Sequence, residues 1–140
     1  MDISQDLMER QKNDKKLKTM PLFVIQKHKA THLHFDFRLE MDGVLKSWAV
    51  PKGLPEEQGV KRLAVSVEDH PLDYIDFEGI IPEGHYGAGI VEIWDNGEYE
   101  IESREEGKIV FHLDGKRRKG SYALIHTNDK NWLIFKLKKS

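Results

Sequence analysis

The sequence predicts a mainly β protein whose strands form one antiparallel sheet that curls strongly or closes into a compact barrel. Two observations support this fold class. Short segments in which apolar and polar residues alternate recur from residue 22 onward, and turn dipeptides such as Asp42-Gly43 and Asp114-Gly115 separate them. Many short strands at close spacing, with few helical stretches between them, are typical of all-β barrels and sandwiches.

The predicted elements follow one another at short intervals. Residues 3–19 are polar with scattered apolar side chains and predict a short amphipathic helix or an arm. We therefore expect an N-terminal arm or short helix over residues 1–20 and a single β domain over residues 21–140. The pairs Asp42-Gly43 and Asn96-Gly97 favour tight hairpins. The predicted strands are residues 22–28, 32–39, 44–50, 62–70, 89–94, 98–102, 108–113, 120–126 and 132–137.

Composition limits the class of protein. A length of 140 residues suits one domain, and 39% hydrophobic with 33% charged residues is typical of a globular chain. No apolar run approaches the roughly 18 residues that span a bilayer. The first residues lack the apolar core of a signal peptide, so we expect an intracellular, cytoplasmic protein. The chain has no cysteine, so a metal would have to bind to His, Asp or Glu.

The charge distribution is balanced overall. The formal net charge is −2, so a nucleic-acid partner would need a local basic patch. Residues 10–18, 116–119 and 136–139 are candidates, although such runs are more often solvated segments.

The glycine-rich segment 84–89 lacks the strand–helix context of a dinucleotide-binding loop, and we expect a turn with close backbone approach.

The segment 32–39 is the most informative predicted strand. Its apolar residues alternate with His32, His34, Asp36 and Arg38, so the polar set shares one face of the strand. Imidazole and carboxylate groups are typical ligands of a transition metal, and a guanidinium suits a phosphate or carboxylate. A solvated strand face is the simpler alternative.

Two other predicted strands carry similar groups. Gln26 and His28 share one face of segment 22–28. In segment 62–70 we interpret Leu63, Val65 and Val67 as the core side, with the polar residues on the opposite side: Arg62, Ser66, Glu68 and His70. If the polar faces line one concavity of a curved sheet, metal ligands and cations meet in a single pocket.

Such a pocket suits metal-assisted hydrolysis of a phosphate ester, in which the metal polarises a phosphoryl oxygen and cations balance the developing charge. Zn, Mn and Fe are all compatible with His and Asp ligands. The pair His34-x-Asp36 with one further histidine also fits the facial triad of a non-haem iron oxygenase, which remains an alternative.

Several segments together resemble a known family. They occur in the same order and with matching spacing over roughly residues 20–137. The segments are Phe23-Val24-Ile25-Gln26-Lys27-His28-Lys29-Ala30, Leu33-His34-Phe35-Asp36-Phe37-Arg38-Leu39-Glu40, Ser47-Trp48-Ala49-Val50-Pro51-Lys52-Gly53, Val67-Glu68-Asp69-His70-Pro71-Leu72-Asp73-Tyr74, Ile81-Pro82-Glu83-Gly84 with Tyr86-Gly87-Ala88-Gly89, and Gly120 with Trp132-Leu133-Ile134. This pattern is similar to the 3′-phosphoesterase domain of bacterial DNA ligase D. The resemblance implies a compact β-barrel with short flanking helices.

The resemblance also implies a manganese-dependent enzyme that heals DNA 3′ ends. Such an enzyme removes a 3′-terminal ribonucleoside as a phosphodiesterase and then the remaining 3′-phosphate as a phosphomonoesterase, which exposes a hydroxyl. Co²⁺ or Zn²⁺ could replace Mn²⁺. The implied metal ligands are His28, His34 and Asp36. The implied phosphate-binding residues are Arg38, Lys52 and Arg62, supported by Gln26. The implied catalytic residues are His70, Arg38, Glu68 and Tyr74, and His70 serves chiefly the phosphomonoesterase step.

The implied partners are primer–template DNA 3′ ends that carry a terminal ribonucleotide or a 3′-phosphate, and a separate DNA ligase. We expect a monomer that does not associate with membranes. His32 falls at a position that the family pattern leaves open, and neither His32 nor His85 is assigned a role. A nucleic-acid-binding accessory module without turnover is the alternative from another functional class.

Overall fold

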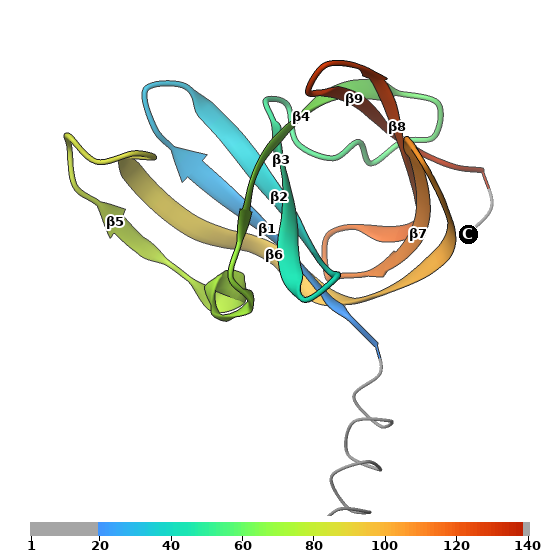
Figure 1. The fold of residues 1–140 in the computed structure, drawn as a ribbon, viewed down its shortest axis with the longest axis horizontal. Coiled ribbons are helices and arrows are strands. Elements are labelled where there is room, and N and C mark those ends of the chain that lie inside the picture. The colour runs from blue at the N-terminus through green and yellow to red at the C-terminus, as the bar shows by residue number, and fades with distance from the viewer. Residues whose placement is uncertain (1–19, 139–140) are drawn as a thin grey trace, which may run out of the picture.

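The computed structural model describes residues 20–138, and the predicted arm or helix over residues 1–20 therefore lies, apart from Met20, outside the described residues. The described part consists almost entirely of strands (Figure 1). The elements are β1 (Leu22–Lys29), β2 (Leu33–Met41), β3 (Val44–Val50), β4 (Lys61–His70), the 3₁₀ helix η1 (Leu72–Asp76), β5 (Gly79–Ile81), β6 (Gly89–Glu105), β7 (Lys108–Asp114), β8 (Lys119–Asn128) and β9 (Asn131–Lys136).

Eight of these strands close into an antiparallel barrel. Neighbouring strands follow the order β1-β2-β3-β4-β9-β8-β7-β6, and β6 pairs back onto β1. The predicted curled or closed antiparallel sheet is confirmed. Strand β5 pairs with β6 outside this ring, and the segment from η1 to β5 stands beside the barrel, at the left of Figure 1. Among residues 20–138, η1 is the single helix, so this one short turn is all that the described part shows of the expected flanking helices.

The hairpin predicted at Asn96-Gly97 is wrong. Both residues lie inside the 17-residue strand β6, which continues through them without reversing. This strand pairs with β1 up to Glu98 and with β7 from Glu98 onward, so a change of partner occurs where a turn was expected. By contrast, Asp42-Gly43 joins β2 to β3 with φ angles of 56° and 80°, as a tight hairpin requires.

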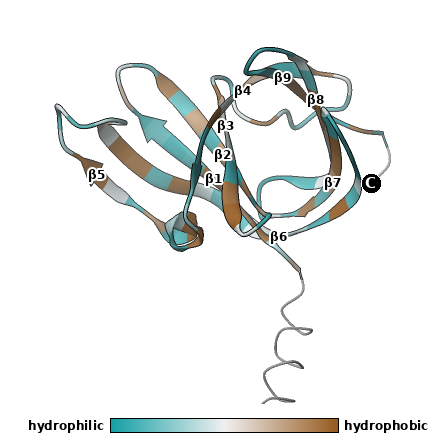
Figure 2. Cartoon of the chain, viewed as in Figure 1, coloured by the Kyte–Doolittle hydropathy of each residue, from teal (hydrophilic) through white to brown (hydrophobic). Residues whose placement is uncertain are grey.

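The core fills the inside of the barrel. Strands show alternating hydrophobic and hydrophilic bands, because successive side chains point to opposite faces (Figure 2). On β2, for example, Phe37 and Leu39 pack into the core while Asp36 and Arg38 lie on the other face. The buried cluster comprises Phe23, Ile25, Phe37, Leu39, Met41, Trp48, Val50, Leu54, Ala64, Tyr99, Ile109, Phe111, Leu113, Tyr122, Leu124 and Ile134.

The predicted core side of β4 is also wrong. Leu63 is 45% exposed, whereas Ala64 is fully buried in the core cluster. Alternation then places Arg62 and Ser66 on the side of Ala64, and Ser66 pairs with the buried Trp48. The sequence pattern favoured the larger apolar side chains Leu63, Val65 and Val67 as the core side of β4. In the structure the small side chain of Ala64 lies inside the barrel instead.

No helix in the described part of the chain is long and apolar enough to cross a membrane. This finding agrees with the absence of long apolar runs in the sequence.

Candidate active site

A cavity of about 230 Å³ lies on the outer face of the barrel, opposite the core. Strands β1 to β4 form its floor, and η1, β5 and the following loop contribute its other wall. Most of the polar residues singled out in the sequence meet here. The lining residues are His28, Ala30, His34, Asp36, Arg38, Ala49, Val67, Glu68, His70, Tyr74, Ile81, Tyr86 and Gly87.

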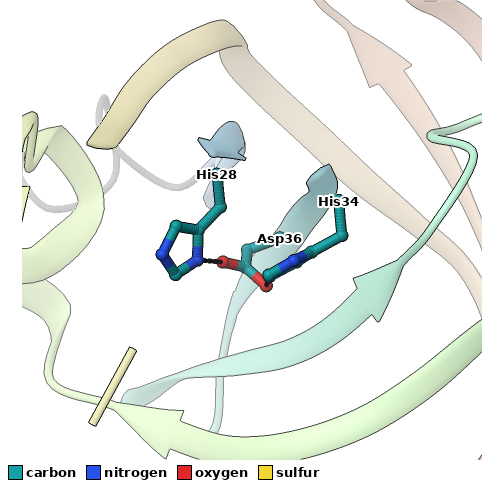
Figure 3. Close-up of side chains that lie close together, drawn as sticks. All are labelled: His28, His34 and Asp36. Atoms are coloured by element: carbon teal, nitrogen blue, oxygen red, sulfur yellow. Dashed lines mark hydrogen bonds and ion pairs between the residues drawn. The ribbon is translucent and has the colours of Figure 1, made fainter. Parts of the chain in front are cut away.

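The β1–β2 hairpin brings three potential metal ligands together. His28 pairs directly with His34 across the two strands, and Asp36 pairs with Gln26. Directly opposed residues of an antiparallel pair have their side chains on the same face, so the two imidazoles and the carboxylate converge (Figure 3). One ligand atom from each of His28, His34 and Asp36 lies within 4.8 Å of the other two.

The hydrogen bonds of the two imidazoles suit metal binding. Nε2 of His28 lies 2.8 Å from the carbonyl oxygen of Gly87, and Nδ1 of His34 lies 3.1 Å from that of His32. A carbonyl oxygen can only accept, so in the neutral rings these two nitrogens carry the protons. The other ring nitrogens then carry lone pairs that point toward Asp36. Nδ1 of His28 lies 3.1 Å from Oδ2 of Asp36, and Nε2 of His34 lies 3.2 Å from Oδ1.

Three acceptor groups in contact are stabilised by a proton or a metal cation between them. The hydrogen bond to Asp36 raises the pKa of His34 above its ordinary value, which favours a proton on this ring. Burial raises the pKa of Asp36, but the hydrogen bond from His34 and the charge of Arg38 outweigh it, so the net shift is downward. Backbone carbonyls that fix the imidazole tautomers are a common feature of histidine metal ligands. The donor set therefore fits a divalent transition metal.

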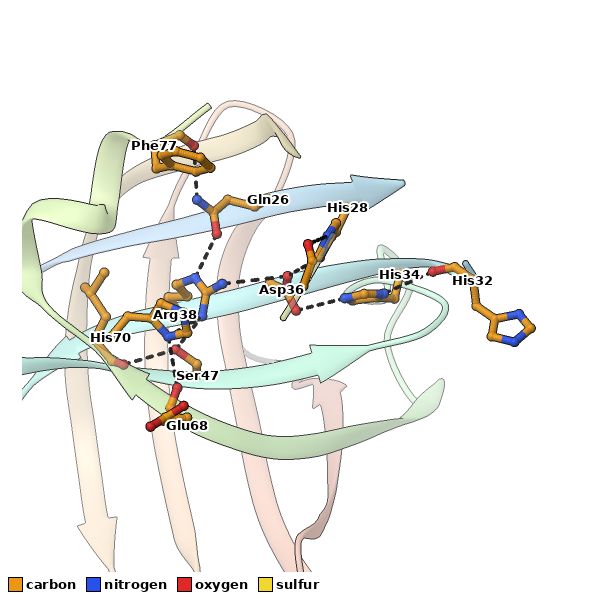
Figure 4. Close-up of polar contacts among 12 residues, drawn as sticks. Gln26, His28, His32, His34, Asp36, Arg38, Ser47, Glu68, His70 and Phe77 are labelled. Atoms are coloured by element: carbon orange, nitrogen blue, oxygen red, sulfur yellow. Dashed lines mark hydrogen bonds and ion pairs between the residues drawn. The ribbon is translucent and has the colours of Figure 1, made fainter. Parts of the chain in front are cut away.

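Arg38 lies beside this group and is held from several sides (Figure 4). Its Nε donates a 2.7 Å hydrogen bond to Gln26, and its Nη1 donates a 2.8 Å bond to Ser47. Its Nη2 is 3.7 Å from Oδ2 of Asp36. Burial lowers the pKa of the Arg38 guanidinium, yet an arginine pKa starts so high that the group stays charged at neutral pH. A buried, oriented cation is thus placed next to the carboxylate.

His70 reaches the same cavity through an irregularity in β4. Across β3 and β4, Ser47 pairs with Val67 but Leu45 pairs with His70, so β4 contains one extra residue between these pairs. This β-bulge turns His70 to the face of Val67, toward the site. Burial and the nearby charge of Arg38 lower the pKa of His70, which favours the neutral ring.

Tyr74 and the backbone complete this side of the cavity. Nδ1 of His70 lies 2.9 Å from the carbonyl oxygen of Glu68 and 3.1 Å from Nη1 of Arg38, and these contacts require opposite protonation states of Nδ1. The Tyr74 ring lies 4.7 Å from the His70 ring and 5.0 Å from the guanidinium carbon of Arg38. Tyr74 also stacks on Phe77, which fixes the orientation of its ring.

Two of the expected phosphate-binding residues lie elsewhere. Lys52 and Arg62 do not line the cavity that holds His28, His34 and Asp36. Arg62 donates through Nη1 to the carbonyl oxygens of Lys52, at 2.7 Å, and Gly53, at 3.1 Å. It lines a separate hollow with Glu56, Glu57, Val60 and Arg118. In this structure Arg62 holds the loop that carries Lys52, and a phosphate role for the two residues stays a prediction.

Gln26 has a different place from the one expected. Its side chain is fully buried, and both ends of its amide are used: Oε1 accepts from Arg38, and Nε2 donates to the carbonyl oxygen of Phe77 at 3.1 Å. A contribution of Gln26 to phosphate binding would therefore act through the position of Arg38. Exposed Glu68, by contrast, does line the cavity.

Sequence reasoning missed several groups that the fold brings to the site. Ser47 pairs with Arg38 across β2 and β3, and the small polar residue in the middle of an apolar strand was a usable signal. The carbonyl groups of Phe77 and Gly87 had no signal, because every residue has a carbonyl group. Tyr86 was quoted within a glycine-rich segment but received no role of its own.

The chain was compared with known proteins. The profile of the family described as DNA Ligase D 3′-phosphoesterase domain matches residues 26–126. The chain is 54% identical over 125 residues to the multifunctional non-homologous end joining protein LigD of Pseudomonas aeruginosa, which covers 83% of this chain and 15% of that protein. It is 54% identical over 120 residues to the LigD DNA repair protein of Mycobacterium tuberculosis, covering 83% and 16%.

A third relative is the LigD protein of Mycolicibacterium smegmatis, at 50% identity over 127 residues, covering 83% of this chain and 17% of the relative. The chain thus spans only about one-sixth of the length of the curated relatives that it matches. The family profile nevertheless covers most of the barrel and all three potential metal ligands, His28, His34 and Asp36. This chain belongs to the DNA Ligase D 3′-phosphoesterase domain family.

Proposed function

We propose that this chain is a metal-dependent phosphoesterase that heals DNA 3′ ends for non-homologous end joining. It removes a 3′-terminal ribonucleoside by phosphodiester hydrolysis and then removes the 3′-phosphate, leaving a 3′-hydroxyl. The observation that carries the proposal is the convergence of His28, His34 and Asp36 beside the buried cation of Arg38 in one cavity. The family description and the names of the relatives support the substrate class.

The metal ligands in this proposal are His28, His34 and Asp36. Mn²⁺ is the proposed metal, with Co²⁺ or Zn²⁺ as possible replacements, since all three accept imidazole and carboxylate ligands. When bound, the ion supplies Lewis-acid polarisation of the phosphoryl group. The carbonyl groups of Gly87 and His32 hold the two imidazoles in the tautomers that present a lone pair.

Arg38 is the proposed phosphate-binding group of the cavity. Two of its nitrogens are oriented by Gln26 and Ser47, so little rotamer freedom is lost when substrate binds. Its Nη2 lies 3.7 Å from Oδ2 of Asp36, which is longer than a hydrogen bond, and can therefore donate to a phosphoryl oxygen. A fixed guanidinium stabilises charge that develops on the phosphoryl group in the transition state.

His70 is the proposed acid–base group, chiefly for the phosphomonoesterase step. Its lowered pKa keeps the imidazole neutral near pH 7, so the ring can accept a proton or a hydrogen bond. Tyr74 packs against His70 and Arg38 and keeps both in place. Lys52, Arg62 and Glu68 are retained as proposed contributors at the edge of the site.

The proposed partners are DNA 3′ ends and a ligase that seals the healed end. We further propose that the protein acts as a monomer in the cytoplasm. A two-histidine, one-carboxylate set is also found in iron oxygenases. Family membership favours phosphoester hydrolysis over that reaction.

Two labelled primer–templates test the proposal, one ending in a single ribonucleotide and one ending in a 3′-phosphate. With Mn²⁺ the protein should convert the first to a 3′-phosphate end and both to a 3′-hydroxyl end. His34→Ala should abolish both reactions, whereas His32→Ala, which removes an exposed side chain and keeps the backbone carbonyl, should retain them. DNA binding without product from either substrate would instead favour the accessory-module alternative.

A further inference from the structure

Tyr86 is an exposed aromatic residue at the edge of the active-site cavity. Its side chain is 85% exposed, yet it lines the same cavity as His28, Asp36 and Arg38. Exposure alone does not mark a binding residue, since single exposed hydrophobic side chains are common on protein surfaces. The position of Tyr86 on the wall of the cavity that holds His28, Asp36 and Arg38 is what makes it a candidate contact for a substrate.

The loop that carries Tyr86 is fixed relative to the metal group. The amide of His85 donates to the carbonyl oxygen of Pro82 at 3.3 Å, and that of Ala88 donates to the carbonyl oxygen of His85 at 3.2 Å. The next residue, Gly87, has φ +77° and accepts the 2.8 Å hydrogen bond of His28 Nε2. One metal ligand is therefore hydrogen-bonded to the residue that follows Tyr86.

An apolar side chain lies beside the same loop. A methyl group built on Gly87 would be 3.8 Å from both Cδ1 of Ile81 and Cε1 of His28, so these two side chains flank the glycine. Ile81 and Tyr86 both line the cavity. The rim on the side of His28 is thus an aromatic ring with an aliphatic neighbour, whereas the floor is charged.

The size of the cavity implies that a nucleotide extends over this rim. Its volume of about 230 Å³ is below the roughly 300–1,000 Å³ of sites that enclose a drug-sized ligand. A phosphodiester together with the nucleosides on both of its sides is larger than this cavity. With the phosphate held at His28, His34, Asp36 and Arg38, part of the attached nucleosides must therefore lie outside, against the rim or in solvent.

We propose that Tyr86, supported by Ile81, forms a subsite on which a nucleobase adjacent to the scissile phosphate stacks. The inference rests on the proposed function and adds a base-binding element to it. Stacking on an aromatic ring accepts any base, so the subsite should bind DNA ends without strong sequence preference. The base can belong either to the terminal nucleoside or to the nucleotide before it, and the two sources can be separated by experiment.

Substitutions at Tyr86 with matched substrates test the subsite. Tyr86→Leu should raise KM for the ribonucleotide-ended primer about 10-fold, because a stacked base contributes on that order to binding. Tyr86→Phe and Tyr86→Trp should retain wild-type KM, since both keep an aromatic ring. Ile80→Ala is the control, because Ile80 is 75% exposed and alternates with Ile81 on β5, so it faces away from the cavity.

Abasic primers identify the base. If the terminal base stacks, removing it should raise the wild-type KM and abolish the difference in KM between the wild type and Tyr86→Leu. If the preceding base stacks, only removal of that preceding base should have these two effects. In that case Tyr86→Leu should also raise KM for the 3′-phosphate substrate. An unchanged KM for Tyr86→Leu, or a 10-fold increase that persists with both abasic primers, would overturn the proposal.

The same subsite can be tested without turnover. A primer with 2-aminopurine at the terminal or preceding position should lose fluorescence on binding to wild-type protein, because stacking quenches this base, and should lose less with Tyr86→Leu. Inactive wild-type protein that still quenches the probe would contradict the proposed function alone. Active protein with equal quenching by wild-type and Tyr86→Leu at both positions would contradict the subsite alone.

Discussion

Oε1 of Gln26 accepts a 2.7 Å hydrogen bond from Nε of Arg38, and both side chains are almost completely buried. The same glutamine donates from Nε2 to the carbonyl oxygen of Phe77, just beyond η1. Gln26 therefore connects the barrel strand β1, the cation of the site and the segment that covers it. Its role in this structure is to position Arg38.

Replacement of Gln26 should affect catalysis through Arg38. Gln26→Met keeps the volume but removes the acceptor, so the guanidinium loses a charge-assisted hydrogen bond worth about 1.5–3 kcal/mol. We expect kcat/KM on the 3′-phosphate primer to fall about 10- to 100-fold, with Mn²⁺ affinity unchanged. Steady-state kinetics and a metal titration measure the two quantities. Wild-type kinetics in a folded Gln26→Met protein would contradict the positioning role.

Metal affinity should depend on His34 and not on His32. Loss of a group that merely supports a ligand typically lowers metal affinity 10- to 100-fold, so loss of a ligand itself should exceed that range. We expect His34→Ala to weaken Mn²⁺ binding by at least about 100-fold in a calorimetric or electron-paramagnetic titration. His32→Ala should bind Mn²⁺ like the wild type, since only the His32 carbonyl contacts His34. Similar losses in the two variants would refute the proposed ligand set.

The two hydrolytic steps should separate at His70. His70→Ala should leave ribonucleoside removal near the wild-type rate and lower 3′-phosphate removal about 100-fold or more, a typical contribution of general acid–base catalysis. Product analysis on a ribonucleotide-ended primer should then show accumulation of the 3′-phosphate intermediate. Equal loss of both steps would point to His70 as a support for Arg38, which it contacts at 3.1 Å.

Stability at high pH should depend on Tyr122. Burial raises the pKa of Tyr122 to about 12, from an ordinary value of about 10, and its hydroxyl donates to the carbonyl oxygen of Pro55. The unfolded chain releases this proton at lower pH than the folded chain does. The stabilisation by this group is therefore complete below pH 10 and is lost as the pH rises from about 10 to 12.

Tyr122→Phe tests this pH dependence by urea unfolding at several pH values. At pH 7 the variant should be less stable by about 1 kcal/mol, because the Pro55 carbonyl loses its donor. The difference between wild type and variant should shrink between pH 10 and pH 12. A constant difference across that range would show that Tyr122 does not contribute to alkaline unfolding.

Much of the fold followed from local pattern. Period-two alternation located most strands within one or two residues, and Asp42-Gly43 forms the predicted hairpin. The failures have a common cause. Asn96-Gly97 stays inside β6 because that strand exchanges β1 for β7, and Leu63 turns outward because Ala64 fits the barrel interior. Both outcomes depend on partners that are distant in sequence.

The site shows the same division. In the sequence, alternation puts His34 and Asp36 on one face of a strand, and the family resemblance adds His28 as the third implied ligand. The pairing of β1 with β2 brings these three side chains together. Only the tertiary structure decided which other groups join them. A one-residue bulge in β4 aims His70 at the cavity, and the loop after β5 adds Tyr86. Alternation fixes the face of a side chain only after strand partner and register are set, and barrel closure sets both.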